Sequence, residues 1–225
     1  MSPLIERLLS LQRADGTWSG VAWNRGFTST MHAPMLLRDL GADPADPAVA
    51  DAVARVRDQV TWAGCGPDEC ATHRFFAGEV EPRINGQVAA VGAYFGQDVR
   101  PLVDRLLGEQ LSDGGWNCDA ERGSMRSSFH TTICVLEGLL LYDQFHRGAK
   151  VETGAAQERG REFLLAHRLF RSHRTGNVIK SEFASSLDTI EVEGIRKTIL
   201  LQTSDFSRIQ MTPVRVSLNL LQREP

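Results

Sequence analysis

The feature that most constrains the fold is a seven-residue frame, Q-x-x-D-G-x-W, that occurs twice in the chain. It reads "QRADGTW" at 12–18 and "QLSDGGW" at 110–116. The two copies start 98 residues apart, which is two periods of 49. A period of that size is typical of arrays of helical hairpins. The frame therefore predicts an all-α chain built from repeated pairs of helices.

Two kinds of helix alternate along the chain. The segments 4–12 and 101–110 carry apolar residues at i, i+3, i+4 spacing, which predicts outer helices with one face in water. The segments 30–41, 83–96 and 128–142 are more apolar and richer in small residues. Such a composition is typical of inner helices that pack on several sides.

The repeat also has irregular parts. Further outer helices are expected at 49–60 and 155–170, which makes about four hairpins in a repeat domain over residues 1–176. A long insertion at 61–82 replaces one frame, and loops of this length are usually functional or mobile. Residues 177–225 have lost the repeat, and we expect an irregular segment there, either helical or partly stranded.

Each residue type of the frame has a structural reason. A glycine ends a helix in the left-handed conformation, and Asp-Gly makes a tight turn. The tryptophan covers the turn, and its N–H needs a partner when it is buried. The glutamine at the helix end is expected to supply that partner or to stack under the ring. The residues with this structural role are Gln12, Asp15, Trp18, Gln110, Asp113 and Trp116.

The stretches "LLSLQRADGTW" and "LLGEQLSDGGW" resemble the Q-W repeats of squalene and oxidosqualene cyclases. The same α/α-toroid recurs in the β subunits of protein prenyltransferases, and the resemblance covers residues 3–174. It implies an α/α-toroid-like array of about four hairpins, fewer than a full ring of that family has. We therefore expect an open or incomplete ring, or one completed by a second copy in a homodimer.

The resemblance also implies a function. It points to a protein that binds an apolar or isoprenoid ligand in a cavity formed by the inner helices. The Asp-x-Asp-Asp motif with which the cyclases protonate their substrate is absent from this sequence. Because one fold serves many activities, two other classes stay open: a non-catalytic binding or scaffold module, and a glycan-active α/α-toroid enzyme.

A candidate zinc site follows the second frame. The prenyltransferases hold zinc with an Asp, a Cys and a His that opens an inner helix, and His130 in "SFHTTICVLEGL" stands in the matching place. Cys118 and Asp119 lie just upstream, and a zinc-bound thiolate would be a nucleophile. The family order is Asp-x-Cys, whereas here the two residues are adjacent and reversed. The alternative is therefore a buried cysteine beside a helix-capping aspartate.

The segment "FFAGEVEPRING" places aromatic rings and carboxylates where an inner helix begins. Phe75 and Phe76 suit a carbocation through cation–π attraction, and Glu79 is the acid we expect to donate a proton. Asn85 and His32, near the starts of two inner helices, complete the expected substrate-binding residues. The same residue types suit a sugar site with paired acids. The alternative is a solvated loop with two core phenylalanines.

Two basic segments are candidates for anion binding. Arg126 lies just before an inner helix in "RGSMRSSFHTT", where arginine and a helix N-terminus both favour a diphosphate head group. Its alternative is a capping Ser128 with exposed arginines. The stretch "RLFRSHRTG" at 168–176 is the densest basic run, and it predicts either a solvated helix end or a phosphate site.

Composition limits the partners and the compartment. The 25 Lys and Arg against 28 Asp and Glu give a net charge of −3, and no basic run is long enough for a nucleic-acid track. Four widely spread cysteines do not make a disulfide scaffold. The sequence shows no signal peptide and no run near the ~20 apolar residues that span a bilayer. We therefore expect a cytoplasmic protein without an integral membrane segment.

Overall fold

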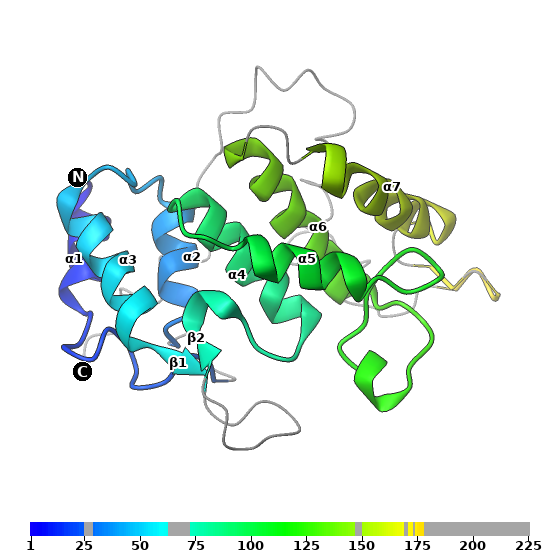
Figure 1. Cartoon of the computed structure of the whole chain (residues 1–225), viewed down its shortest axis with the longest axis horizontal. Helices are drawn as coiled ribbons and strands as arrows, with labels where there is room; N and C mark the ends of the chain where they lie inside the picture. Colours follow the sequence, from blue (N-terminus) through cyan, green and yellow to red (C-terminus); the bar gives the residue numbers. More distant parts are fainter. Residues whose placement is uncertain (25–28, 63–72, 147–149, 169–170, 173, 178–225) are drawn as a thin grey trace. The chain divides into compact units, whose positions relative to one another are not determined.

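The computed structural model describes residues 1–24, 29–62, 73–146, 150–168, 171–172 and 174–177. Within these ranges the chain is mostly helical, with seven α-helices and one two-stranded antiparallel sheet (Figure 1). The helices are α1 (Pro3–Ser10), α2 (His32–Asp39), α3 (Pro47–Gln59), α4 (Pro82–Tyr94), α5 (Arg100–Gly108), α6 (Phe129–Phe145) and α7 (Lys150–Ala166). The other elements are β1 (Thr61–Trp62), β2 (His73–Arg74), and the 3-10 helices η1 (Phe75–Ala77) and η2 (Ala120–Arg122).

These helices lie where the sequence predicts them. The expected outer helices are α1, α3, α5 and α7, and the expected inner helices are α2, α4 and α6. The last outer helix begins at Lys150 rather than at 155 and ends at Ala166 rather than at 170. In the part of the chain that the structure describes, no helix is both long and apolar enough to cross a membrane. The segment 178–225, expected to be irregular, lies outside the described residues.

The described residues form two compact units. The first contains Met1–Glu79 together with Val91–Val99, and the second contains Val80–Ala90 together with 100–177. Helix α4 contributes its first part to the second unit and its last turn to the first.

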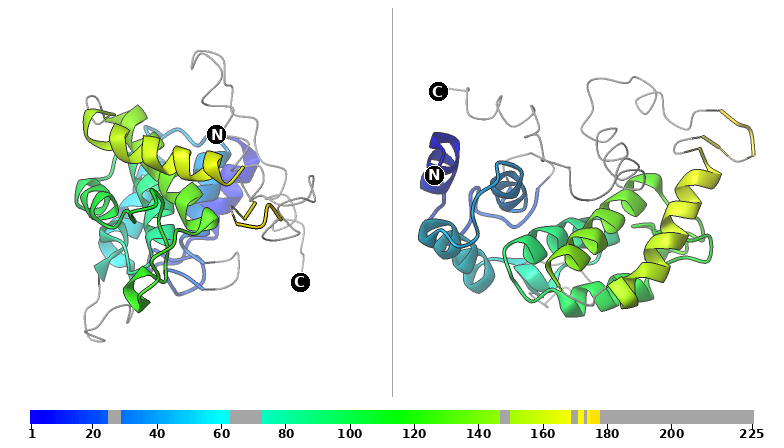
Figure 2. Two further views of the ribbon diagram at one scale, coloured as in Figure 1. Left: turned by 90° about the vertical axis from the view of Figure 1, so that its right-hand side faces the viewer. Right: turned by 90° about the horizontal axis from the view of Figure 1, so that it is seen from above.

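In the first unit, α1 packs against α2 and α3 (Figure 2). Both α1 and α3 begin with a capping side chain followed by proline, since Ser2 and Asp46 accept hydrogen bonds from main-chain N–H groups of the first turn. The face of α3 that carries Val49, Val53 and Val56 is buried. The amphipathic spacing read from the sequence is therefore the packing face of this helix.

The insertion at 61–82 is more ordered at its ends than a long loop would be. Thr61 pairs with Arg74 and Trp62 with His73 in the small sheet. The Trp62 and Phe75 rings stack with centroids 5.2 Å apart, and Trp62 Nε1 donates to the Phe75 carbonyl oxygen at 2.8 Å. The expectation of a loop throughout the insertion is therefore wrong at both ends, because buried aromatic rings hold them together. Residues 63–72 lie outside the described part.

In the second unit, α4 and α6 approach backbone to backbone. A Cβ atom on Gly86 would collide with the carbonyl of Cys134, and one on Gly138 would collide with the carbonyl of Gly86. This contact explains the small residues that the sequence places on its inner helices.

Helix α7 lies along α6, and buried polar groups join the two (Figures 1 and 2). Asp143 on α6 accepts hydrogen bonds from the Thr153 hydroxyl at 2.6 Å and from Gln157 Nε2 at 2.7 Å. Thr153 and Gln157 are both buried on α7. The carboxylate thus satisfies two buried donors and fixes the register of the two helices.

Candidate functional site

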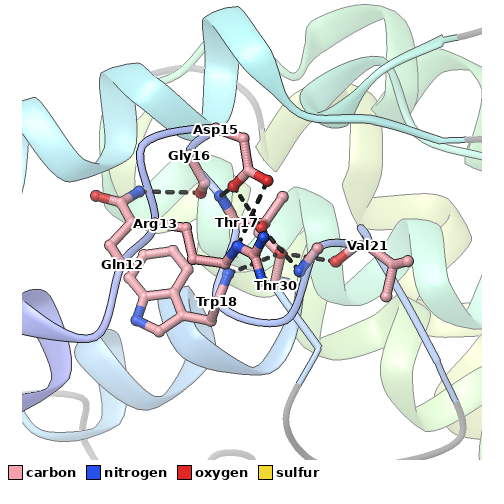
Figure 3. A network of polar contacts seen from close by, with 9 residues as sticks. Gln12, Arg13, Asp15, Gly16, Thr17, Trp18, Val21 and Thr30 are labelled. Atoms are coloured by element: carbon pink, nitrogen blue, oxygen red, sulfur yellow. Dashed lines mark hydrogen bonds and ion pairs between the residues drawn. The ribbon is translucent and has the colours of Figure 1, made fainter.

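The first Q-x-x-D-G-x-W frame follows α1 and binds to α3. Figure 3 shows the polar contacts within its turn. Gln12 Nε2 donates to the carbonyl oxygen of Gly16 at 3.0 Å and to that of Ala52 on α3 at 2.9 Å. Gly16 has a φ of +77°, and a Cβ there would come within 2.8 Å of the Arg55 carbonyl oxygen. The turn therefore needs glycine for both its backbone conformation and its closeness to α3.

The second frame connects α5 to α7 in the same way. Gln110 Nε2 donates to the carbonyl oxygen of Gly114 at 2.7 Å and to that of Ala156 at 2.8 Å. Gly114 has a φ of +99°, and a Cβ there would come within 2.6 Å of the Arg159 carbonyl oxygen. The contacts on the two later helices also correspond. The alanine that accepts from the glutamine lies three residues before the arginine beside the glycine, Ala52 before Arg55 and Ala156 before Arg159.

The two tryptophans also make matching hydrogen bonds. Trp18 Nε1 donates to the Leu8 carbonyl oxygen at 2.8 Å, and Trp116 Nε1 donates to that of Leu106 at 2.7 Å. The expectation that the glutamine serves the tryptophan N–H is therefore wrong, because the preceding helix supplies that acceptor. The main-chain N–H groups of the tryptophans donate to the hydroxyls of Thr30 and Thr132, at 3.3 and 3.0 Å.

The aspartates of the two frames accept hydrogen bonds from different residues. Asp15 accepts from the hydroxyl and the main-chain N–H of Thr17 within its own turn, and these hydrogen bonds lower the pKa of its carboxyl group. Asp113 instead accepts from the main-chain N–H and the hydroxyl of Ser127. The second frame thereby holds the segment that leads into α6.

This segment and the start of α4 surround Cys118, where the first frame has Gly20. The Cys118 sulfur lies 3.5 Å from the Thr131 hydroxyl on α6. It also accepts from the main-chain N–H of Arg83, in the first turn of α4, and lies in hydrogen-bonding reach of the Glu81 carboxylate. We call Glu81, Arg83, Cys118 and Thr131 the Cys118 cluster.

The surroundings keep the Cys118 thiol protonated. Burial raises the pKa of this thiol, and the charge of Glu81 raises it further. The Thr131 hydroxyl and the Arg83 N–H act in the opposite direction, with a smaller combined effect. The group is therefore a neutral thiol that can donate a hydrogen bond to the neighbouring carboxylate.

The structure does not bring the three expected zinc ligands together. Asp119 is exposed and pairs with Arg122 at 2.9 Å, while His130 is the second residue of α6. In the described ranges, which include Cys118, Asp119 and His130, no three His, Cys, Asp or Glu side chains are placed to hold a metal ion. The family arrangement of zinc ligands is thus not reproduced around the second frame.

The expected substrate-binding residues of the insertion and the inner helices are mostly buried. Phe75 and Phe76 are 1% and 6% exposed and meet edge to face, as core phenylalanines do. Asn85 is fully buried in α4, and the expected acid Glu79 is also buried. His32 opens α2 with its Nδ1 2.7 Å from the Ser29 hydroxyl.

Arg126 is exposed, and Ser128 caps α6 by accepting from the main-chain N–H of Thr131 at 3.4 Å. The described arrangement is thus the alternative of a capped helix with exposed arginines. Glu81 is one of the carboxylates that the sequence places in this segment, but its contact with Cys118, like that of Arg83, was not predicted. Their only signal was their position, on either side of the proline that starts α4.

A half-buried carboxyl group just after α5 gives a prediction on stability. Glu109 accepts from Arg105 Nε at 2.6 Å through one oxygen, while its other oxygen is buried without a hydrogen-bond partner among the described residues. Burial raises the pKa of Glu109 above its ordinary value of 4.5, against the effect of Arg105. Folded protein then holds the proton more tightly than unfolded chain, so the free energy of unfolding falls as pH rises above about 4.5.

We expect Glu109→Gln to remove this part of the pH dependence. The free energy of unfolding of the variant, relative to the wild type, should rise between pH 4 and pH 7, as measured by urea unfolding at both values. Glu158→Gln, which alters an exposed glutamate paired with Arg161, is the control and should not show the trend. If the free energies of unfolding of Glu109→Gln and the wild type differed by the same amount at both pH values, the raised pKa of Glu109 would be contradicted.

The Cys118 cluster combines a thiol, a carboxylate and a hydroxyl with the main-chain N–H of an arginine. In the described part of the chain, the Nε atom of Arg83 is buried and has no hydrogen-bond partner. Such an atom is costly to leave unpaired, and it belongs to the residue whose main-chain N–H contacts Cys118. Comparisons of the chain with protein-family models, with curated proteins and with solved structures found no significant match.

Proposed function

We propose that the chain is a terpenoid-cyclase- or prenyltransferase-like protein with an α/α-toroid-like array, and that it binds an isoprenoid ligand at the Cys118 cluster. The observation that carries the proposal is the duplicated frame. Both copies use glutamine, glycine and tryptophan in the same hydrogen bonds to the preceding and the following outer helix. This duplication supports the resemblance to Q-W repeats.

The cluster favours a ligand with an anionic or hydroxyl end. The main-chain N–H groups in the first turn of α4 favour negative charge. We expect the buried Nε of Arg83, which has no partner among the described residues, to donate to a ligand oxygen. Cys118 and Thr131 add groups that both donate and accept. Glu81 opposes a second negative charge, so a ligand oxygen is expected to bind nearest Arg83 and Thr131.

Calorimetry with farnesyl diphosphate, farnesol and inorganic diphosphate tests the proposal. We expect farnesyl diphosphate to bind more tightly than either part alone, and Arg83→Gln to weaken its binding about tenfold through loss of a charged hydrogen bond. Arg57→Gln is the matched control, because Arg57 is an exposed arginine of α3 that pairs with Asp58. If no isoprenoid compound binds up to millimolar concentration, the proposal is wrong.

A second candidate is a non-catalytic scaffold module. It is favoured by the burial of Phe75, Phe76 and Asn85, since side chains expected to line a cavity lie in the core. The backbone contact of Gly86 and Gly138 also closes the space between α4 and α6 at that level. A protein that binds no isoprenoid compound would fit this candidate.

A further inference from the structure

A second polar site lies at the end of α7, and it is made of other residues than the Cys118 cluster. It is a pocket of about 190 Å³ with a strongly basic lining. The lining residues are Ala166, His167, Arg168, Arg171, Ser172 and Gly176. Three of these six carry basic side chains and none carries an acid, in a chain whose net charge is −3. We call it the α7 pocket.

The pocket is held in shape by contacts of its own residues. The His167 ring packs against Phe129 and Phe163, with centroid distances of 5.2 and 4.8 Å. Its Nδ1 lies 3.1 Å from the Arg171 carbonyl oxygen, which can only accept, so Nδ1 carries a hydrogen. Arg171 in turn donates to the Gly176 carbonyl oxygen at 3.0 Å and closes the loop.

The backbone of Arg168 is the unusual feature of the pocket. With a φ of +47°, it is the one residue other than glycine with a positive φ in the described ranges. An L-residue with a side chain pays conformational energy for this angle, whereas glycine does not. This angle is the left-handed ending that helices commonly have just past their last residue, where glycine is usual, so an arginine here keeps its side chain at a conformational cost.

We propose that the α7 pocket binds a phosphate group, either as the free ion or as part of a phosphate monoester. Arginine presents a planar set of N–H donors that matches phosphate oxygens, and two arginines line this pocket with a serine hydroxyl beside them. The pocket volume is several times the roughly 30 Å³ that one water occupies in the liquid, so it holds more than a single solvent molecule.

A structural role for the basic residues makes a different prediction. Cations near the last turn of a helix stabilise it by interacting with the unpaired carbonyls. If the basic residues only stabilised the end of α7, replacing Arg168 would lower the stability of the protein, and the wild type would bind no phosphate. If Arg168 serves binding, its replacement by glycine relieves the positive φ and leaves a protein at least as stable, but with weaker phosphate binding.

Calorimetry of the full chain at constant ionic strength separates these roles. We expect the wild type to bind inorganic phosphate or phenyl phosphate, and Arg168→Gly to raise the dissociation constant about tenfold with an unchanged or higher melting temperature. Arg171→Gln is a second variant with the same expected loss of binding. Tighter binding of phenyl phosphate would identify the ligand as a monoester, and tighter binding of inorganic phosphate would identify the free ion.

Arg57→Gln is the matched control. Arg57 is an exposed arginine of α3, outside the lining of the α7 pocket, and pairs with Asp58 of the same helix. This variant should bind phosphate as the wild type does. Two results would overturn the proposal: a wild type that binds neither compound at millimolar concentration, or Arg168→Gly and Arg171→Gln variants that bind as tightly as Arg57→Gln.

Discussion

Replacing Trp116 with alanine is expected to lower the free energy of unfolding by about 4 kcal/mol. The Trp116 side chain is fully buried, and it donates a hydrogen bond from its ring to the end of α5. Gly160 on α7 lies so close that a Cβ there would come within 3.1 Å of the ring. Removing the indole therefore leaves a cavity and an unpaired carbonyl in the second unit. Urea unfolding measures the loss.

Two further variants separate the contribution of the buried apolar surface from that of the hydrogen bond. Trp116→Phe keeps most of the apolar surface but leaves the Leu106 carbonyl oxygen unpaired, and should cost about 1–2 kcal/mol. Trp18→Ala makes the same change in the first frame, where the tryptophan is partly exposed, and should cost about 2 kcal/mol. Equal losses for Trp18→Ala and Trp116→Ala would contradict this account of the frame.

Gly138→Ala is expected to destabilise the protein by about 3 kcal/mol, a large effect for one methyl group. The added Cβ would collide with the main-chain carbonyl of Gly86, which sits in the middle of α4 and cannot move without displacing the helix. The two helices would have to separate, and the contacts along both would weaken.

Gly154→Ala is the matched control on α7. A Cβ at Gly154 meets nothing within 4 Å, so the same substitution should stabilise the helix by about 0.5–1 kcal/mol. The two changes are thus expected to have opposite signs in thermal or urea unfolding. A Gly138→Ala variant as stable as Gly154→Ala would show that α4 and α6 do not meet at this point.

Much of the fold could be predicted from local sequence. The starts of α1 and α3 follow from a capping Ser or Asp before proline, and their faces follow from apolar spacing. The repeat of the frame identified the two turns, because glycine at positive φ has few substitutes. Local rules were sufficient wherever the physical cause lies within a few residues.

Contacts between distant residues could not be predicted in the same way. Gln12 and Gln110 bind carbonyls of helices about 40 residues further along, and the sequence gives no sign of which helix returns to the turn. The same holds for Cys118, whose neighbours Glu81 and Arg83 come from another hairpin. Proximity in sequence likewise placed Asp119 beside Cys118 as an expected zinc ligand, whereas in the structure its carboxylate pairs with Arg122.

The two frames differ in the residues that follow them and in the hydrogen bonds of their aspartates. The first frame joins α1 to α3 and the second joins α5 to α7, but only the second continues into a cysteine, at the place where the first has Gly20. Asp113 then holds Ser127 at the entrance to α6, whereas Asp15 stays within its own turn. Only the second copy of the frame thus leads into a polar cluster, around the partly buried Cys118.

The most direct test of the proposed function is the rate at which iodoacetamide alkylates Cys118, followed by mass spectrometry of its peptide. The buried Cys134 serves as the internal reference for unfolding. At a farnesyl diphosphate concentration ten times its dissociation constant, we predict that alkylation of Cys118 slows about tenfold while Cys134 stays unreacted. An unchanged rate at Cys118 under saturating ligand would contradict the assignment of the ligand site to the Cys118 cluster.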